Sequence, residues 1–379
     1  MANKKTLLMV VNVDWFLISH RLCIAKGALK EGWRVIVVAK DTGRAQEIRD
    51  EGIEFINIPL TRSGTKPVKE LMVFLKLVRL YKEIQPTIIH QITLKPIIYG
   101  SIITRFLKIK AVVNAISGLG FNFTNNKKGW VPKIMKWLLR VGFSHMKSDV
   151  IFQNKEDYIE LKEASIVKSH HKIHVIKGSG VNLTDFECFP EISKKKTVIL
   201  FAARMLWNKG IKELKQVTDL LKATHEGKIL FVLCGIIDND SKDAVPIEYL
   251  KKWEHEGYVT WLGHQENMAA IYKKCDIVVF PSYREGMPKT LLEACAIGRP
   301  IVTTNANGCR DCVEEGENGY IVAVKSVEEL KHAILKLVDS PELRAKMGIY
   351  GRKKAEREFN EQDVIKKHLE IYNSLSKGW

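Results

Sequence analysis

The sequence lacks any hydrophobic run long enough to cross a membrane. Its first apolar run, residues 7–13, is followed at once by Asp14, and a later run, residues 96–107, is interrupted by Gly100 and Arg105. A spanning helix needs about 20 consecutive apolar residues, and the small-residue cleavage site of a signal peptide is missing after the first run. We therefore expect a globular protein of the cytoplasm without a membrane-spanning segment.

Signals for paired cysteines are also lacking. The seven cysteines are an odd number, and only Cys309 and Cys312 form a CxxC pair, whereas a structural zinc site usually needs two such pairs. Buried thiols in a reducing compartment explain them more simply. Asp238 and Asp240 in "DND", and the histidines of residues 169–174, fall in predicted surface loops. We therefore expect neither a metal site nor a cofactor.

Acidic residues are scarce in the first half of the chain. Residues 1–190 contain 30 Lys and Arg against 16 Asp and Glu, and residues 101–150 contain nine against one. Residues 129–147 interleave lysines with apolar side chains (Trp130, Ile134, Trp137, Leu138 and Phe143), and residues 66–81 have a similar character. Such segments are typical of helices that lie on an anionic membrane surface. A core-facing helix with a solvated basic side has the same pattern.

The chain alternates short β-rich runs with segments of helical period. The runs begin near residues 6, 34, 54, 87, 111, 149 and 172, and again near 197, 228, 259, 276, 300 and 319. This rhythm predicts an α/β protein with two Rossmann-like, doubly wound parallel-sheet domains, residues 1–189 and 190–359, with an irregular linker at residues 182–196. Because open α/β sheets bind ligands at the carboxyl ends of their strands, we expect the domains to face each other across a cleft.

The stretch "PSYREGMPKTLLEA", residues 281–294, places Glu285 before a predicted helix and Glu293 inside it. Pro288 suits the first helical position, and the backbone N–H groups of residues 288–290 would attract a phosphate. Two carboxylates that flank a phosphate site suit the hydroxyl groups of sugars. A nucleotide sugar has that layout, although Glu285 as a first-turn acid and Glu293 as an ordinary helix residue remain the alternative.

A second loop with cations lies ahead of Gly210 in "VILFAARMLWNKGIKEL". Arg204 and Lys209 follow the first predicted strand of the second domain, and both side chains suit a diphosphate, Arg204 as a fork and Lys209 as a point charge. The alternative is a solvated basic loop.

These motifs resemble the retaining, GT-B-fold glycosyltransferases of glycosyltransferase family 4. The resemblance rests on residues 203–214, 261–302 and 307–322, which fall in the order and spacing of the family. It implies that Arg204 and Lys209 hold the donor diphosphate, that Glu285 contacts the donor sugar, that Glu293 contacts the ribose, and that a terminal helix from about residue 360 completes the first domain. The resemblance also implies a base site near Gly263 and His264. The predicted donor-binding loop and helix start comprise Gly286, Met287, Pro288, Lys289, Thr290 and Leu291.

The first domain departs from the common form of the family. The usual Gly-rich loop is replaced by "NVDWFLISHR", residues 12–21, and the histidine that many relatives carry after the fifth strand is replaced by Ser117 and Gly118. With "HQITLKPIIYG" and "NAISGLGF", this loop resembles a sub-branch that adds N-acetylhexosamines to undecaprenyl-diphosphate-linked sugars. The candidate residues on this side are Asn12, His20, Arg21, His90, Lys95, Asn114, Ser117 and Gly118.

Each first-domain candidate has an expected role. His20 and His90 would hydrogen-bond an acceptor or donor oxygen, although a structural histidine is an equal alternative for both. Lys95 and Arg21 would pair with the diphosphate of the acceptor, and Asn114 with a sugar amide or hydroxyl.

The resemblance implies transfer of an N-acetylhexosamine, with GalNAc favoured, from a UDP-sugar to an undecaprenyl-diphosphate-linked sugar. The linkage would be α, in assembly of a bacterial N-glycan or an O-antigen or capsule type of polysaccharide, at the inner face of the cytoplasmic membrane. Rival hypotheses are a different sugar acceptor, a UDP-sugar epimerase on the same fold, or a basic binder of nucleic acid or anionic surfaces. The carboxylates at the donor motif argue against nucleic acid as the partner.

Overall fold

The computed structural model describes residues 5–60, 67–120, 130–144, 148–189, 195–238, 241–256 and 258–377. The chain divides into two compact units, which we call unit 1 (residues 1–179 with 362–379) and unit 2 (residues 180–361). The division falls earlier than the predicted linker, because that segment packs on unit 2. Phe186 and Phe189 lie against its core, and Arg352 donates to the carbonyl of Phe186.

Unit 1 is built on a parallel sheet with the strand order β3-β2-β1-β4-β5-β6-β7. Its strands are β1 (Thr6–Val13), β2 (Arg34–Lys40), β3 (Glu54–Asn57), β4 (Ile88–Ile92), β5 (Val112–Ile116), β6 (Asp149–Phe152) and β7 (Lys172–Val175). The order reverses between β1 and β4, which makes their carboxyl ends the topological switch point of this sheet. All eight residues of β1 are buried, because helices cover both faces of a doubly wound sheet.

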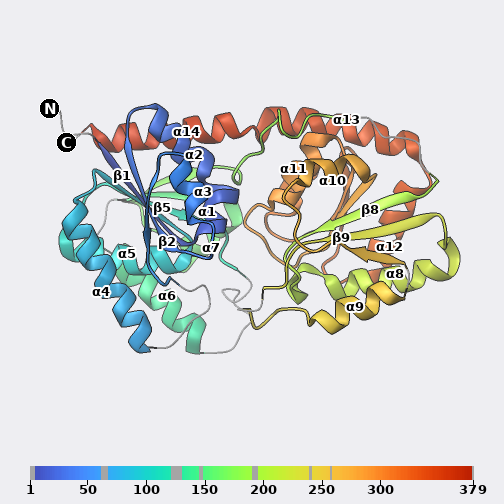
Figure 1. Cartoon of the computed structure of the whole chain (residues 1–379), viewed down its shortest axis with the longest axis horizontal. Helices are drawn as coiled ribbons and strands as arrows, with labels where there is room; N and C mark the ends of the chain where they lie inside the picture. The colour runs from blue at the N-terminus through green and yellow to red at the C-terminus, as the bar shows by residue number, and fades with distance from the viewer. Residues whose placement is uncertain are drawn as a thin grey trace. The chain divides into compact units, whose positions relative to one another are not determined.

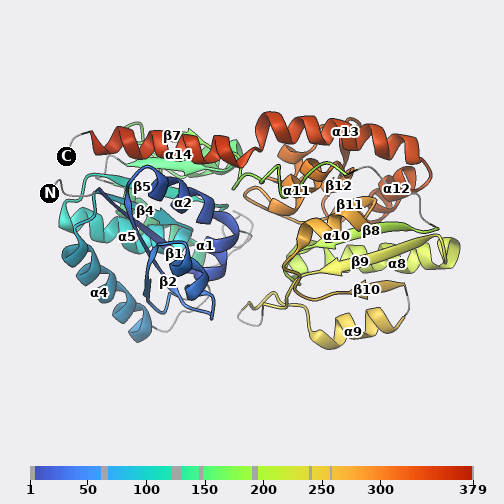
Figure 2. The same cartoon turned by 45° about the horizontal axis from the view of Figure 1, so that its top comes forward.

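The helices of unit 1 lie on both faces of its sheet (Figures 1 and 2). They are α1 (Asp14–His20), α2 (Leu22–Lys30), α3 (Ala45–Asp50), α4 (Pro67–Ile84), α5 (Leu94–Leu107), α6 (Trp130–Phe143), α7 (Lys155–Glu163) and α14 (Glu361–Ser376). One apolar cluster joins β1 and β2 to α2 and α14, with Val364 and Tyr372 contributed by α14. Val73 and Leu77 of α4 bury against the other face.

Unit 2 repeats the plan with the strand order β10-β9-β8-β11-β12-β13, again parallel throughout. Its strands are β8 (Thr197–Ala202), β9 (Ile229–Cys234), β10 (Val259–Trp261), β11 (Ile277–Phe280), β12 (Ile301–Thr304) and β13 (Gly319–Val322). The helices are α8 (Ile211–His225), α9 (Ile247–His255), α10 (Met268–Lys274), α11 (Lys289–Ile297), α12 (Val327–Val338) and α13 (Pro341–Glu358), with short 3₁₀ turns η2 (Trp207–Lys209) and η3 (Arg310–Cys312).

The predicted fold class is confirmed, since each predicted β-rich run contains a strand of one of two doubly wound parallel sheets. The switch point of the second sheet lies between β8 and β11, whose carboxyl ends carry the two motifs that we singled out. Within the described ranges, no helix combines the length and the hydropathy that a bilayer crossing requires.

Candidate active site

The loops after β8 and β11 are held together at the switch point of unit 2. The hydroxyl of Thr290, at the start of α11, donates to the carbonyl of Ala202 at 2.7 Å. The backbone N–H of Tyr283 donates to the carbonyl of Asn208 at 3.0 Å. These bonds place the two predicted donor motifs side by side, as their positions after neighbouring strands require.

Lys209 and Glu285 form an ion pair in this loop pair. Ser282 donates its hydroxyl hydrogen to the same carboxylate at 2.5 Å, and the backbone N–H of Glu285 donates to the carbonyl of Asn307 at 3.0 Å. Both charged side chains are mostly buried, so solvent screens their attraction only weakly. The structure therefore brings these two predicted catalytic residues together, with two partners on the carboxylate and one on the backbone of Glu285.

Arg204 lies in the same loop and pairs with Asp238, which follows β9. Asp238 belongs to the "DND" sequence that resembles a metal motif, and here its carboxylate meets a guanidinium instead. Asp240 lies outside the described residues.

Two glycines allow these backbones to approach each other. Gly210 has φ +78°, and a Cβ there would lie 2.2 Å from the carbonyl oxygen of Pro281. Gly308 has φ +75°, and a Cβ there would lie 2.3 Å from the carbonyl oxygen of Gly286. The sequence analysis missed Asn307 and Gly308 as parts of the site. The Asn-Gly dipeptide after β12 was the available signal, because it marks a tight turn.

The start of α11 lies at the same edge. Pro288 is the residue that precedes the helix, and the first turn of a helix presents N–H groups that lack an intrahelical acceptor. Leu291 is not among these donors, since its N–H bonds to the carbonyl of Pro288 at 3.0 Å and its side chain is in the core. The side chain of Met287 is also buried, against the thiol of Cys312. The predicted donor contacts of Met287 and Leu291 stay predictions.

Glu293 is 7% exposed, although it is a charged residue. Its carboxylate lies 3.5 Å from the ammonium of Lys289, one turn earlier. Burial raises the pKa of Glu293, and the charge of Lys289 opposes that rise. A buried carboxylate that costs stability is unusual for an ordinary helix position, which favours the functional interpretation of Glu293.

The loop after β10 holds the predicted base site. The backbone N–H of Gly235 donates to the carbonyl of Gly263 at 2.7 Å, so this loop is tied to the end of β9. The indole of Trp261 donates to the carbonyl of Gly235 at 3.1 Å. His264 is exposed. The predicted base contact near Gly263 and His264 stays a prediction.

On unit 1, Arg21 and Ser117 come together across the carboxyl edge of the sheet. Arg21, at the end of α1, donates to the hydroxyl oxygen of Ser117 at 3.2 Å. Its other terminal nitrogen donates to the carbonyl of His20 at 2.8 Å. Gly118 follows with φ +107°. Asn12, at the end of β1, is buried with an amide oxygen that has no hydrogen-bond partner.

Two other first-domain candidates have buried side chains. His90 is inaccessible to solvent, and its Nδ1 shares a hydrogen bond of 2.6 Å with the hydroxyl of Tyr372 on α14. Asn114 is also buried, beside the hydroxyl groups of Ser101 and Ser148. The hydrogen bond to Tyr372 favours the structural alternative for His90, and the predicted substrate contacts of both residues stay predictions.

Lys95 and His20 keep surface positions with partners of their own. Lys95 donates to the carboxylate of Glu70 at 2.8 Å, which compensates its charge. His20 stacks on Phe16 with ring centroids 4.4 Å apart and contacts the hydroxyl of Ser19 through Nδ1. Their predicted roles at the acceptor stay predictions.

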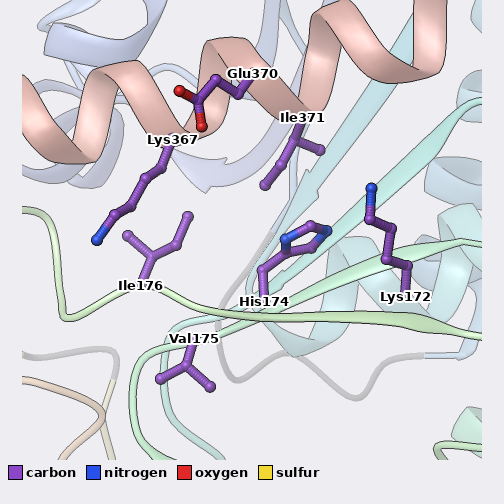
Figure 3. A pocket seen from close by; sticks show the side chains of 7 residues that line it. All are labelled: Lys172, His174, Val175, Ile176, Lys367, Glu370 and Ile371. Atoms are coloured by element: carbon purple, nitrogen blue, oxygen red, sulfur yellow. The ribbon is translucent and has the colours of Figure 1, made fainter.

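A separate pocket of about 250 Å³ lies in unit 1 between β7 and α14. Figure 3 shows Lys172 and His174 on the strand side, and Lys367 and Glu370 on the helix side. His174 is bound to Asp149 at 2.7 Å. None of the predicted site residues lines this pocket.

Two doubly wound parallel sheets of this topology are the architecture of the GT-B fold class. Residues 186–354 match the family model described as glycosyl transferases group 1, and residues 6–154 match the model described as glycosyl transferase 4-like. The chain belongs to the glycosyltransferases that these two models describe.

Known relatives of similar length support this assignment. The chain is 26% identical to the N,N'-diacetylbacillosaminyl-diphospho-undecaprenol alpha-1,3-N-acetylgalactosaminyltransferase of Campylobacter jejuni, over 94% of this chain and 96% of the relative. It is 23% identical to the UDP-Gal:alpha-D-GlcNAc-diphosphoundecaprenol alpha-1,3-galactosyltransferase of Escherichia coli, over 90% and 89%. A sucrose-phosphate synthase structure from Thermosynechococcus elongatus superposes with a TM-score of 0.81 at 17% identity, over 99% of this chain and all of that one.

Proposed function

We propose that the protein is a retaining glycosyltransferase that moves an N-acetylhexosamine, with GalNAc favoured, from a UDP-sugar to an undecaprenyl-diphosphate-linked sugar. The observation that carries the proposal is the convergence of Lys209, Glu285 and Arg204 at the switch point beside the start of α11. The names of the relatives from C. jejuni and E. coli support a lipid-diphosphate acceptor, and that of the E. coli relative supports a UDP-linked donor.

The donor would bind through charges that are already in place. Lys209 and Arg204 would move from their carboxylate partners to the diphosphate, which offers a larger negative charge. The N-terminus of α11 adds a favourable dipole for the same anion. Glu285, released from Lys209, would accept hydrogen bonds from the sugar hydroxyls, and Glu293 would accept from the ribose.

Front-face attack is the mechanism that this arrangement favours. With the donor bound, the carboxylate of Glu285 would accept hydrogen bonds from the sugar hydroxyls and from Ser282, and these bonds would make it a poor nucleophile. The acceptor hydroxyl would form its bond to the anomeric carbon on the face that the phosphate leaves, and its proton would pass to the departing phosphate oxygen. Lys209 and Arg204 would stabilise the charge that develops on that oxygen. The product would keep the α configuration.

A helix stripe on unit 1 supports association with a membrane surface. Val68, Leu71, Met72 and Leu75 recur at helical spacing on α4, and all four are exposed. Trp137 is exposed on α6. Figure 1 shows α4, α5 and α6 on one side of the unit, and α5 packs against both neighbours.

The surroundings of this stripe are basic. Lys69, Lys76 and Arg79 are exposed on α4, and Lys133 and Arg140 on α6. Apolar side chains framed by lysine and arginine fit an anionic lipid leaflet. The acceptor is a lipid, so peripheral binding at the inner face of the membrane would bring the enzyme to its substrate.

Co-sedimentation with vesicles tests the membrane surface. Leu71→Ser with Trp137→Ser should release the protein from vesicles that contain about a third phosphatidylglycerol, and wild type should bind these better than neutral phosphatidylcholine vesicles. Ile349→Ser is the matched control, because Ile349 and Leu71 are both 58% exposed and Ile349 lies in unit 2. Equal release by the control would contradict the surface assignment.

Transfer assays test the activity itself. We expect label from one UDP-N-acetylhexosamine in a panel of UDP-sugars to enter membrane-extracted undecaprenyl-diphosphate sugars, and NMR of the product to show an α linkage. A β linkage would contradict the retaining mechanism. Consumption of a UDP-sugar without lipid labelling would contradict the transferase assignment and favour an epimerase.

A further inference from the structure

Arg21 is a buried cation, with 2% of its surface exposed. Among the described residues, its hydrogen bonds go to two neutral oxygens, the carbonyl of His20 and the hydroxyl of Ser117. Its Nε has no hydrogen-bond partner, and among the residues that the structure describes Arg21 forms no ion pair with a carboxylate. A buried charge without a counter-charge is costly, so folding alone does not favour an arginine here.

The surroundings of Arg21 add no negative charge. His90 and His368 lie nearby, and burial together with the charge of Arg21 lowers the pKa of both. Unit 1 as a whole contains 33 Lys and Arg against 16 Asp and Glu. The electrostatic potential at this edge of the sheet is therefore positive, and an anion is the ligand that it favours.

Ser117 is the outward-facing neighbour of this cation. It follows β5 directly, and it is partly exposed whereas Arg21 is not. Because its oxygen accepts a hydrogen bond from Arg21, its own hydrogen is left for another acceptor. A hydroxyl that accepts from a cation is polarised and becomes a stronger donor.

The end of the neighbouring strand gives an independent indication of a binding site. Thr93, the residue after β4, has φ +72° and ψ 160°, a conformation that costs about 1–3 kcal/mol for a residue other than glycine. Its buried hydroxyl has no partner. Its N–H donates to the carbonyl of Ala115 at 3.1 Å, which places it beside the end of β5. Strained residues with unpaired polar groups cluster at ligand sites.

We propose that Ser117, held by Arg21, donates a hydrogen bond to an oxygen of a substrate diphosphate, with Arg21 as the positioning residue. The inference rests on the proposed function, because both the UDP-sugar and the lipid acceptor carry a diphosphate. The proposal explains why a charged residue is buried here. Arg21 would act on the diphosphate through the hydroxyl of Ser117, without contacting the diphosphate itself. The first unit of this chain would then recognise a phosphate group with a serine after β5.

Calorimetric binding to the full chain tests the proposal with two probes, UDP and farnesyl diphosphate. Ser117→Ala should weaken binding of at least one probe about 10-fold or more, since hydrogen bonds to charged groups are strong ones. Weaker farnesyl diphosphate binding assigns the contact to the acceptor diphosphate, and weaker UDP binding assigns it to the donor. Unchanged binding of both probes, or no binding of either by wild type, would overturn the proposal.

Ser144→Ala is the matched control. Ser144 also lies in unit 1, and its hydroxyl also accepts from an arginine at 3.2 Å, namely Arg105. Its substitution should leave both affinities unchanged, and both variants should keep the melting temperature of wild type within a few degrees. An equal loss in the control would overturn the proposal. Because no transfer is measured, this result is independent of whether the proposed transfer reaction occurs.

A double-variant cycle tests the role of Arg21. Arg21→Gln should weaken binding of the same probe, and Arg21→Gln with Ser117→Ala should bind no more weakly than the poorer single variant. A purely structural role for Arg21 predicts that the two losses multiply. That multiplication would contradict its action through Ser117, and the single Ser117→Ala result stands if Arg21→Gln does not fold.

Discussion

The carboxyl edges of the two sheets differ in the partners of their cationic side chains. At the edge of unit 2 each predicted cation has an anionic partner: Lys209 meets Glu285 and Arg204 meets Asp238. At the edge of unit 1 the buried Arg21 meets only neutral oxygens among the residues that the structure describes. The same contrast holds for whole units, since unit 2 contains 27 Lys and Arg with 27 Asp and Glu, whereas unit 1 contains 33 with 16.

This contrast indicates two ways to prepare for an anionic substrate. In unit 2 the cations form ion pairs with carboxylates. A bound diphosphate would replace these carboxylates as the partner of the cations, and the carboxylate of Glu285 would then accept hydrogen bonds from the donor sugar. Unit 1 keeps an excess of positive charge that only a ligand or a membrane surface would balance. A charge-neutral domain suits a small soluble donor, and a basic domain suits an anionic lipid.

Removal of the paired cation of unit 2 should have the largest effect. Lys209→Ala is expected to lower kcat/KM for transfer by about 10²–10³-fold, because a preorganised group that stabilises transition-state charge contributes about 2.7–4 kcal/mol. Initial rates with a labelled UDP-N-acetylhexosamine measure the change. Lys215→Ala is the control, since Lys215 of α8 also forms ion pairs, with Asp219 and Glu256. A kcat/KM of Lys209→Ala within about threefold of wild type would contradict the proposal that Lys209 stabilises the charge on the departing phosphate.

Acid should destabilise the protein through a histidine of unit 1. Burial lowers the pKa of His368 to about 3, below its ordinary value of about 6.5. As pH falls below about 6.5, the unfolded chain therefore binds a proton that the folded chain rejects, and stability falls until the pH reaches about 3. At pH 5 this histidine alone should lower the free energy of unfolding by about 2 kcal/mol.

Urea unfolding at pH 7 and pH 5 measures this acid effect. His368→Met should remove about 2 kcal/mol of the loss that wild type shows between the two pH values. His332→Met, which changes a histidine of α12 in unit 2, serves as the comparison. Equal pH dependence in wild type and His368→Met would show that the His368 ring is not buried in its neutral form.

The smallest expected effect is that of Glu293→Gln, which should change donor binding and protein stability in opposite directions. Because burial raises the pKa of this carboxyl, its ionised form lowers the stability of the fold at neutral pH. Glu293→Gln should therefore raise the unfolding free energy by up to about 1 kcal/mol while it raises the KM for the UDP-sugar about 10-fold. Kinetics and urea unfolding on the same preparation test both. A variant that loses stability and keeps the donor KM would assign Glu293 a structural role.

The sequence predicted unit 2 better than unit 1 for a physical reason. Arg204, Lys209 and Glu285 lie in two loops after neighbouring strands, so local motifs and the strand order were enough to bring them together. Glu293 was predictable as a helix residue about two turns beyond Glu285, but its burial was not, because a separate element, α10 with Tyr272, lies beside it.

The site residues of unit 1 depend on contacts that sequence patterns do not carry. His90 lies within a strand that is covered on both faces, and the cover includes Tyr372 of α14, far along the chain. Arg21 lies near Tyr372 and His368 of the same helix. Periodicity located the strands correctly, yet it did not distinguish a polar side chain in the core from one at the edge of the sheet.

The most direct test of the division of labour compares two acceptors with the same terminal sugar. One carries the sugar on a prenyl diphosphate, and the other carries it on a neutral alkyl chain of similar length, with one UDP-N-acetylhexosamine as donor. The account predicts that kcat/KM for the neutral acceptor is at least about 100-fold lower, while the donor KM stays the same, because loss of a doubly charged group removes about 3 kcal/mol of binding to unit 1. Equal use of both acceptors would contradict the claim that the positive charge of unit 1 recognises the diphosphate.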